Sequence, residues 1–261
     1  MILLVAAVVA PGPAVAEAVR ALDAGRPEQA REMIRMAVAQ GASGPTVDRL
    51  LADLAFTERR WDEAVARYDA LLAEASDDGS LIERSGIALL HLDRVSEAIF
   101  RLDRATRAPH PGWRSWNARG VAADRQQDWV TADRAYAAGL ALAPDNGVLR
   151  NNRGWSLLLR GRWAEAADWL GQAQALDPDN RRITANADLA RAAAEAGLPQ
   201  RRNGERGSDF AARLNDAGVV ALRQHNPAKA IAAFAQALEA SDQYYVRAAN
   251  NLALVEAGRR D

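Results

Sequence analysis

Side chains that could do covalent or metal chemistry are few in this sequence and stand far apart. The 261 residues include no cysteine, which excludes a disulfide, a thiol nucleophile and a lipid-modified cysteine. The three histidines, His91, His110 and His225, lack the spacing of metal ligands. Acid pairs such as Asp77-Asp78 have no matching base. We therefore expect no catalytic residue, no metal site and no cofactor, and we expect that the protein is not an enzyme.

The charge balance argues against two classes of partner. Thirty-three basic and 34 acidic residues leave a net charge of −1, so no overall field favours nucleic acid or anionic lipid. The one basic cluster contains Arg201, Arg202 and Arg206. We interpret it first as a solvated loop and second as an anion site.

The chain repeats itself every 34 residues, and this is its most informative pattern. The stretch 147–180 has small, aromatic, aliphatic and proline residues at Gly154, Trp163, Ala166, Leu170, Ala173 and Pro178. Thirty-four residues earlier their counterparts are Gly120, Trp129, Ala132, Tyr136, Gly139 and Pro144. The same register continues back through 79–112, 45–78 and 11–44. Five repeats therefore run without a gap from residue 11 to residue 180.

Composition and spacing together predict paired helices. Alanine, the best helix former, supplies 59 of the 261 residues, and no alternating β-branched run is long enough for a strand. Small residues at the eighth and twentieth positions of each repeat are where two helices cross closely. Proline at the thirty-second position ends the second helix, because it cannot continue the hydrogen-bond ladder. Asn146 and Asn180 then cap the next helix. The expected fold class is all-α.

These positions resemble the tetratricopeptide repeat (TPR), which implies a right-handed α-solenoid with more than about 60% helix. After Asn180 the register changes: 181–197 reads as a single Ala-rich helix and 198–209 as a polar loop. We interpret 181–210 as a degenerate repeat, and 211–258 as a further repeat with a capping helix. The repeats leave no room for a catalytic domain, which again argues against an enzyme.

The TPR resemblance implies that a protein or peptide partner binds a concave groove lined by the first helix of each repeat, helix A. In the family, positions two, five, nine, twelve and thirteen point into that groove. The candidate groove residues at such positions are Ile87, Leu90, Asn117, Val121, Asp124, Arg125, Asn151, Trp155, Leu158, Asn215 and Val219.

Two of these candidates carry explicit alternatives. Trp155 is either an anchor for the partner or a partly buried spacer, and the two interpretations have equal weight. For Asn151, a capping or packing role ranks ahead of contact with a peptide. Asparagine is missing from the ninth position of every repeat, so the acidic C-terminal peptides that chaperone-binding TPRs hold are not expected partners.

The first sixteen residues suggest export. An apolar run from Met1 to Ala10 is too short to span a bilayer as a helix, and Ala14-Val15-Ala16 has small residues at the −3 and −1 positions of a cleavage site. This resembles a secretory signal without a positive n-region. We expect a periplasmic protein cleaved after Ala16. The alternative is a cytoplasmic protein in which 1–16 is an apolar tail on the first helix pair.

A narrower resemblance concerns the pathway. The repeat NNRGWSLLLRGRWAEAADWL, followed by a lone helix with Asn-Ala-Asp-Leu-Ala-Arg at 186–191, is similar to the TPR proteins of tight-adherence (Flp) pilus assembly. Those are typically lipoproteins, and this chain lacks the cysteine. The resemblance covers about residues 80–200 and implies a non-catalytic scaffold in bacterial secretion, pilus or envelope assembly. The alternatives are a cytoplasmic co-chaperone or regulator, or an accessory subunit of an enzyme.

Overall fold

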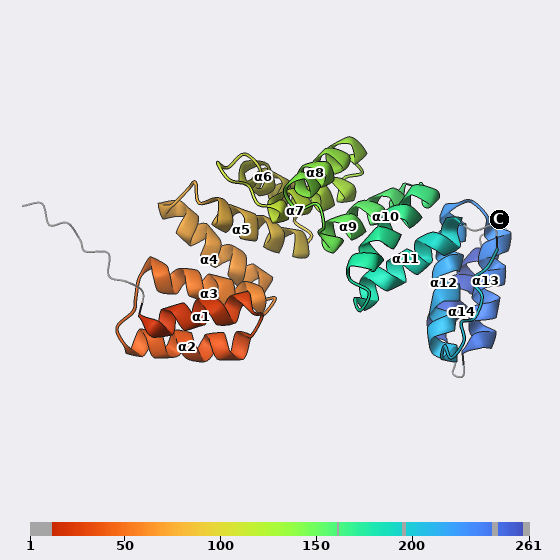
Figure 1. Ribbon diagram of the computed structural model, residues 1–261, viewed down its shortest axis with the longest axis horizontal. Coiled ribbons are helices and arrows are strands. Elements are labelled where there is room, and N and C mark those ends of the chain that lie inside the picture. The colour runs from red at the N-terminus through yellow and green to blue at the C-terminus, as the bar shows by residue number, and fades with distance from the viewer. Residues whose placement is uncertain (1–11, 161, 195–196, 242–244, 258–261) are drawn as a thin grey trace, which may run out of the picture. The chain divides into compact units, whose positions relative to one another are not determined.

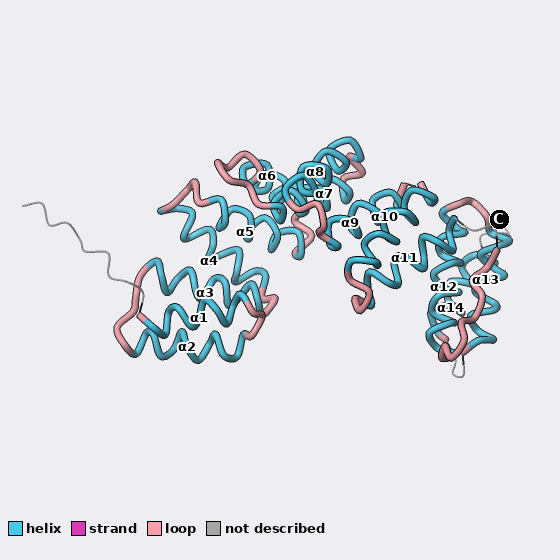
Figure 2. Tube along the Cα trace, in the orientation of Figure 1, coloured by secondary structure: helices cyan, strands magenta, loops and turns pink. Residues whose placement is uncertain are grey.

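The computed structural model describes residues 12–160, 162–194, 197–241 and 245–257. It is 77% helical, with fourteen helices and no strand in the part of the chain that it describes (Figure 2). The prediction of an all-α repeat solenoid is confirmed. The chain divides into two compact units, Met1–Asp128 and Trp129–Asp261.

The first unit contains three helix pairs and one further helix (Figure 1). Each pair consists of a helix A and the helix B that packs on it. The helices are α1 (Pro13–Asp23), α2 (Pro27–Ala39), α3 (Pro45–Thr57), α4 (Trp61–Glu74), α5 (Gly79–His91), α6 (Val95–Ala105) and α7 (Trp113–Arg125).

The second unit begins with a helix B, so the boundary between the units falls inside the repeat at 113–146. Its helices are α8 (Trp129–Leu142), α9 (Gly147–Leu159), α10 (Trp163–Leu176), α11 (Arg181–Ala194), α12 (Gly207–Arg223), α13 (Pro227–Ala240) and α14 (Val246–Ala257). Within this unit α9 packs on α10, α12 packs on α13, and α14 covers α13 (Figure 1). None of the described helices in either unit is long and apolar enough to cross a membrane.

The eighth position of a repeat is small because helix B passes directly over it. A β-carbon built on Gly154 would lie 2.6 Å from Cγ of Leu170 and 3.2 Å from its backbone nitrogen. A β-carbon on Gly86 would lie 2.8 Å from Cγ of Leu102 in the same way. The facing alanine, Ala166, is fully buried. Helix A and helix B therefore approach as closely as their backbones allow, which is the physical reason for the repeating pattern of small residues.

The turns between helices use two local devices. The side chain of Asn146 accepts a hydrogen bond from the backbone N–H of Leu149 at 3.0 Å, and Asn180 accepts one from Ile183 at 3.3 Å, so the predicted caps are confirmed. Between helix A and helix B, the fifteenth residue adopts the left-handed conformation. Positive φ angles occur at that position in five repeats, at Gly25, Arg59, Asp93, Gln127 and His225.

The first helix begins before the predicted cleavage site. Helix α1 begins at Pro13, and Ala14 and Val15 are buried in the core of the first unit with Ile34 of α2 and Leu50 of α3. Cleavage after Ala16 would remove the first turn of this helix and part of that core. Residues 1–11 of the predicted signal lie outside the described residues.

The repeat that begins at Arg181 has no helix B among its described residues. Helix α11 is followed by a loop that reaches α12 at Gly207, four residues before the start that the sequence pattern predicts. Asp188 occupies the eighth position of this interrupted repeat, where the other repeats have Gly or Ala. Its carboxylate accepts a hydrogen bond from Arg202 of the loop at 2.5 Å and another from Arg191. The loop thus covers the eighth position of α11 with ion pairs, whereas in the other repeats helix B covers this position with apolar side chains.

Candidate functional site

A cavity in the first unit brings together helix A of four successive repeats. Its volume is about 510 Å³, which lies in the range of ordinary ligand pockets. The residues that line it from α1, α3, α5 and α7 are Leu22, Asp23, Phe56, Thr57, Ser80, Glu83, Arg84, Ile87 and Arg114, joined by Arg59 and Trp61. We refer to it as the groove cavity. Helix A of every repeat in this unit contributes to the groove cavity, so the cavity is a direct result of stacking the repeats.

Arg84 is fixed at the base of the groove cavity by a polar network. Its guanidinium lies 3.2 Å from the Asp53 carboxylate, and the hydroxyl of Tyr68 donates to the same carboxylate at 2.8 Å. Burial raises the pKa of Tyr68, and the Asp53 charge raises it further. Burial alone would lower the pKa of Arg84, but Asp53 and Tyr68 hold it above its ordinary value. The network keeps a permanent cation inside the cavity without leaving it unpaired.

The polar rim of the groove cavity carries charges of both signs. Arg114 stacks over the ring of Trp113 at 4.6 Å, and among the described residues it has no ion pair. Glu83 accepts a hydrogen bond from the buried hydroxyl of Ser115. Asp23, at the end of α1, is exposed and is likewise outside any ion pair in the described part of the chain. These groups are available to main-chain and side-chain polar groups of a bound segment.

Aromatic side chains form one wall of the groove cavity. Phe56 and Trp61 meet edge to face with ring centroids 5.3 Å apart, and Trp61 stacks on His91 at 4.1 Å with an interplanar angle of 5°. Burial lowers the pKa of His91, and the nearby cations Arg125 and Arg59 lower it further. His91 is therefore a neutral stacking partner at neutral pH, and the wall is apolar.

The predicted groove residues of the first unit have divided roles. Ile87 is half-buried and lines the cavity, whereas Leu90 is buried in the core and presents no surface to a partner. Val121 packs against the same core and is half-buried, as are Asn117 and Asp124. The guanidinium of Arg125 donates to the backbone oxygen of Leu90 at 2.6 Å and to Asp93 at 2.9 Å. The contact of these side chains with a partner stays a prediction, except at Leu90, where burial excludes it.

In the second unit the predicted asparagines hold helices together. Asn151 is 2% exposed, and its side-chain oxygen accepts a hydrogen bond from Asn186 of α11 at 2.8 Å. Asn215 is 4% exposed, and its oxygen accepts one from Asn251 of α14 at 2.9 Å. Both bonds join a helix A to the helix one repeat further on. The packing role weighed for Asn151 fits this geometry, and contact of either amide with a peptide does not.

The remaining candidates of the second unit lie around one core cluster and its neighbour. Leu158 is buried in a cluster with Leu170, so it is not available to a partner. Trp155 is half-buried and packs on that same cluster, as does Trp163 of α10. Val219 is half-buried against Phe234 and Ala230. Trp155 and Val219 keep part of their surface exposed, so their contact with a partner stays a prediction.

Several residues of the groove cavity were missed in the sequence. Phe56 and Thr57 stand at the twelfth and thirteenth positions of their repeat, and these are inward positions that apply to 45–57 as well as to the later helices. Arg84 stands at the sixth position, outside the inward set. The feature of the sequence that could have identified Arg84 is Asp53 in the preceding repeat. The two residues form a pair that becomes visible only when neighbouring repeats are compared.

Comparison with known proteins agrees with the helix-pair fold. A family model for the tetratricopeptide repeat matches residues 15–79, and a second model of the same description matches residues 149–180. One match falls in each unit. The chain is a tetratricopeptide-repeat protein.

Solved structures share the TPR fold at low identity. The APC/C hetero-tetramer Cut9–Hcn1 matches with a TM-score of 0.66 and 13% identity over 91% of this chain and 48% of the other, so the TPR chain spans about half of that relative. PilW, a type IV pilus biogenesis factor, matches with a TM-score of 0.59 and 17% identity over 92% and 96%. A thermophilic TPR protein of Thermus thermophilus matches with a TM-score of 0.60 and 18% identity over 69% and 98%. No curated protein matches the chain.

Proposed function

We propose that this TPR protein is a non-catalytic scaffold that holds a segment of a partner protein in the groove cavity of its first unit. One observation carries the proposal: four successive A helices contribute to one cavity of about 510 Å³. TPR proteins bind protein or peptide partners. The solenoid supports this because each repeat adds another strip to a continuous inner surface.

The lining of the groove cavity favours a particular kind of segment. Phe56, Trp61 and Ile87 form an apolar surface for one large apolar side chain. Arg84, Arg114 and Glu83 surround it with donors and acceptors that can bond the peptide main chain on both sides. A helix or an extended segment with one apolar anchor between polar residues fits this lining.

Site-specific photocrosslinking in the native cell tests the proposal. A benzophenone amino acid replaces Ser80, which lines the groove cavity, and in a matched control it replaces Phe100, which is 64% exposed on helix B of the same repeat. We expect one discrete crosslinked polypeptide from position 80 and none from position 100. Ile87→Glu combined with the position 80 probe should abolish that product. Crosslinking that is equal at both positions, or that survives Ile87→Glu, contradicts binding in this cavity.

In the second unit we propose Trp155 and Val219 as further contacts for the partner. The matched pair Trp155→Ala and Trp163→Ala separates binding from packing, because both indoles touch the same core cluster but only Trp155 stands on a helix A. We expect Trp155→Ala to reduce partner crosslinking with the smaller loss of thermal stability, and Trp163→Ala to do the reverse. Equal loss of stability with full crosslinking in Trp155→Ala would make Trp155 a spacer.

We further propose the periplasm as its location and secretion, pilus or envelope assembly as its context. The apolar run at 1–10 and the Flp-like repeat support this, and PilW shares the fold. The position of α1 favours processing before Pro13 over processing after Ala16, because it preserves the buried side chain of Val15. N-terminal sequencing of protein from periplasmic and cytoplasmic fractions tests both points. An intact Met1 on cytoplasmic protein would favour the co-chaperone or regulator.

A further inference from the structure

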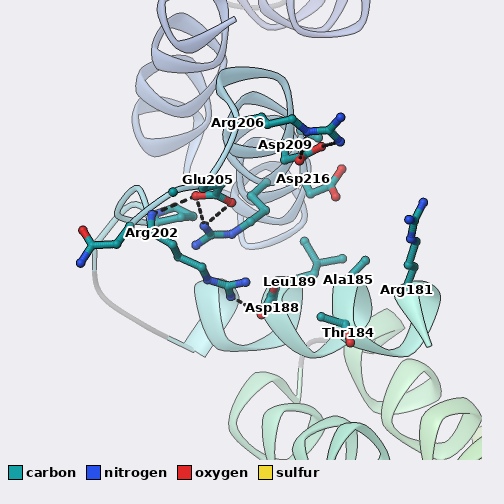
Figure 3. A pocket seen from close by; sticks show the side chains of 15 residues that line it. Arg181, Thr184, Ala185, Asp188, Leu189, Arg202, Glu205, Arg206, Asp209 and Asp216 are labelled. Atoms are coloured by element: carbon teal, nitrogen blue, oxygen red, sulfur yellow. Dashed lines mark hydrogen bonds and ion pairs between the residues drawn. The ribbon is translucent and has the colours of Figure 1, made fainter. Parts of the chain in front are cut away.

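A second cavity lies where helix B is missing. It has a volume of about 610 Å³, is open to solvent on one side, and is bordered by α11, the loop before Gly207 and α12 (Figure 3). Helix α11 contributes Arg181 and Asp188, the loop contributes Arg202 and Glu205, and α12 contributes Asp216. A regular repeat fills this space with apolar side chains, so the interrupted repeat creates an opening lined by charge. We call it the loop cavity.

Three pairs neutralise six of the eight charged side chains in the loop cavity. Arg202 binds Asp188 at 2.5 Å, Arg213 binds Glu205 at 2.9 Å, and Arg206 binds Asp209 at 2.8 Å. Figure 3 shows these bonds as dashed lines. Two of the three arginines in the predicted basic cluster, Arg202 and Arg206, are therefore paired with acids of the same unit, and the third, Arg201, donates to the backbone oxygen of Glu205 at 3.0 Å.

Two charges in the loop cavity have no ion pair within the described residues, Arg181 and Asp216 (Figure 3). Arg181 is exposed at the start of α11, where water solvates its guanidinium. Asp216 is half-buried, and the bond that its carboxylate accepts comes from the neighbouring Asn215 amide at 3.5 Å. Burial raises its pKa, and neither the Asn215 bond nor the charge of Arg247 offsets this. An ionised carboxylate without a cation destabilises the fold, so Asp216 is the group that a ligand would satisfy.

We propose that the loop cavity binds a basic side chain of a partner protein, with Asp216 as the carboxylate that pairs with its guanidinium or ammonium group. The size supports this occupant, since 610 Å³ exceeds one arginine side chain and leaves room for flanking backbone. This proposal depends on the proposed scaffold function in one respect: the basic side chain belongs to a partner protein. It adds a second contact whose chemistry differs from that of the groove cavity.

A bound metal ion fits these residues less well. Divalent cations such as Ca²⁺ need six to eight oxygen ligands, and the other carboxylates of the loop cavity are held by arginines. No group of three or more His, Asp or Glu suited to a metal occurs among the described residues. A single carboxylate matches a single organic cation, because a guanidinium can donate two parallel bonds to it.

A small cation tests the loop cavity independently of any partner. The probe is Nα-acetyl-arginine amide, and its neutral counterpart is Nα-acetyl-citrulline amide, which has nearly the same shape without the charge. Each is titrated into the full chain while backbone amide NMR shifts are followed. We expect the arginine probe to shift residues of α11 and α12 around Asp216, with the citrulline probe at least about tenfold weaker.

Two matched variants assign the effect to one side chain. Asp216→Asn should weaken the arginine probe about tenfold or more, while Glu239→Gln, an exposed carboxylate on α13 that does not line the loop cavity, should leave it unchanged. Circular dichroism confirms that both variants fold. Equal binding of the two probes, or full binding by Asp216→Asn, would overturn the proposal. Because no partner is present, this result is independent of crosslinking in the groove cavity.

The pH dependence gives a further readout. The charged and titratable groups around Asp216 come from four elements: Arg181 and Asp188 of α11, Arg202, Glu205 and Arg206 of the loop, Asp209 and Arg213 of its own helix, and Tyr245 and Arg247 at the start of α14. The pKa values of Glu205 and Asp209 are lowered, whereas burial raises the pKa of Asp216, so Asp216 takes up a proton before these two carboxylates as the pH falls. We expect arginine binding to disappear over the pH range in which Asp216 is protonated. Binding that is constant over that range would contradict the role of Asp216.

Discussion

The repeat at 147–180 and the interrupted repeat that follows it solve the same packing problem in opposite ways. In the first, Gly154 leaves no side chain between α9 and α10, and Leu170 fills the crossing. In the second, Asp188 stands at the equivalent position, 7% exposed, and arginines cover its carboxylate. A crossing of two helices needs a small residue, whereas a loop can cover a charge if it brings a cation of its own.

This difference explains why the interruption leaves a cavity. Helix B seals a repeat because apolar side chains at every turn interdigitate with helix A. The loop before Gly207 offers a few charged side chains instead, and these bond in fixed pairs that do not fill the space between α11 and α12. The regular repeats thus provide stability, and the interrupted repeat provides an opening.

The largest expected effect comes from placing the charge of the interrupted repeat in a regular one. Gly154→Asp would force a carboxylate against Leu170 at the helix crossing, and we expect a loss of about 4 kcal/mol in the free energy of unfolding. Urea denaturation measures it. Gly171→Asp on α10 is the control, because a β-carbon there meets nothing within 4 Å. Similar losses for both variants would mean that the crossing is looser than the structure shows.

A smaller effect is expected when the interrupted repeat loses its charge. Asp188→Ala removes the acceptor for Arg191 and Arg202, but both arginine side chains are about half exposed and can turn to water. We expect a loss of about 1 kcal/mol, with faster amide exchange in the loop than in α9. Asp188→Asn, which keeps one acceptor, should lose less. A loss as large as that of Gly154→Asp would show that the ion pair is as essential as an apolar crossing.

The smallest expected effect is an increase in stability, from the replacement of Asp216. Burial raises the pKa of Asp216 above its ordinary value of 3.8, so the folded state binds this proton more tightly than the unfolded state. The ionised carboxylate therefore destabilises the protein at neutral pH, and that cost fades as the pH falls through the raised pKa. Asp216→Asn should be more stable than the natural chain at pH 7 and lose this advantage in acid. Thermal unfolding across pH measures the difference, and a less stable variant at pH 7 would contradict the argument.

The sequence was sufficient for the fold because the repeating positions report backbone geometry. The eighth and twentieth positions, occupied by Gly154 and Ala166 in the repeat at 147–180, are small because helix A and helix B cross there. A 34-residue period of small residues therefore predicts the helix pairs directly. Asp188 also carried a signal: a charged residue at a position that must be small predicts that helix B is missing. The start of α12 at Gly207 was not predictable in the same way, since it depends on where the loop pairs with α11.

The candidate site was less predictable because position in a repeat gives the face of a helix but not the neighbour on the next helix. Ile87, which was selected by its position alone, lines the groove cavity. Asn151 and Asn215 share a groove position, yet Asn186 and Asn251, 35 and 36 residues further on, bond their side-chain oxygens. Polar groups in a solenoid therefore have to be examined in pairs, one repeat apart, before they are assigned to a partner.

The left-handed turn between helix A and helix B has an evolutionary consequence. Arg59, Asp93, Gln127 and His225 occupy a conformation that glycine adopts without strain, as Gly25 does at the same position. Each non-glycine residue in this conformation lowers the free energy of unfolding by roughly 1 kcal/mol relative to glycine. Gln127 is exposed and lines neither cavity, so a change to glycine at that position can compensate for a destabilising change in a binding surface. Stabilising substitutions at these turns would allow the binding surfaces to change during evolution while the protein stays folded.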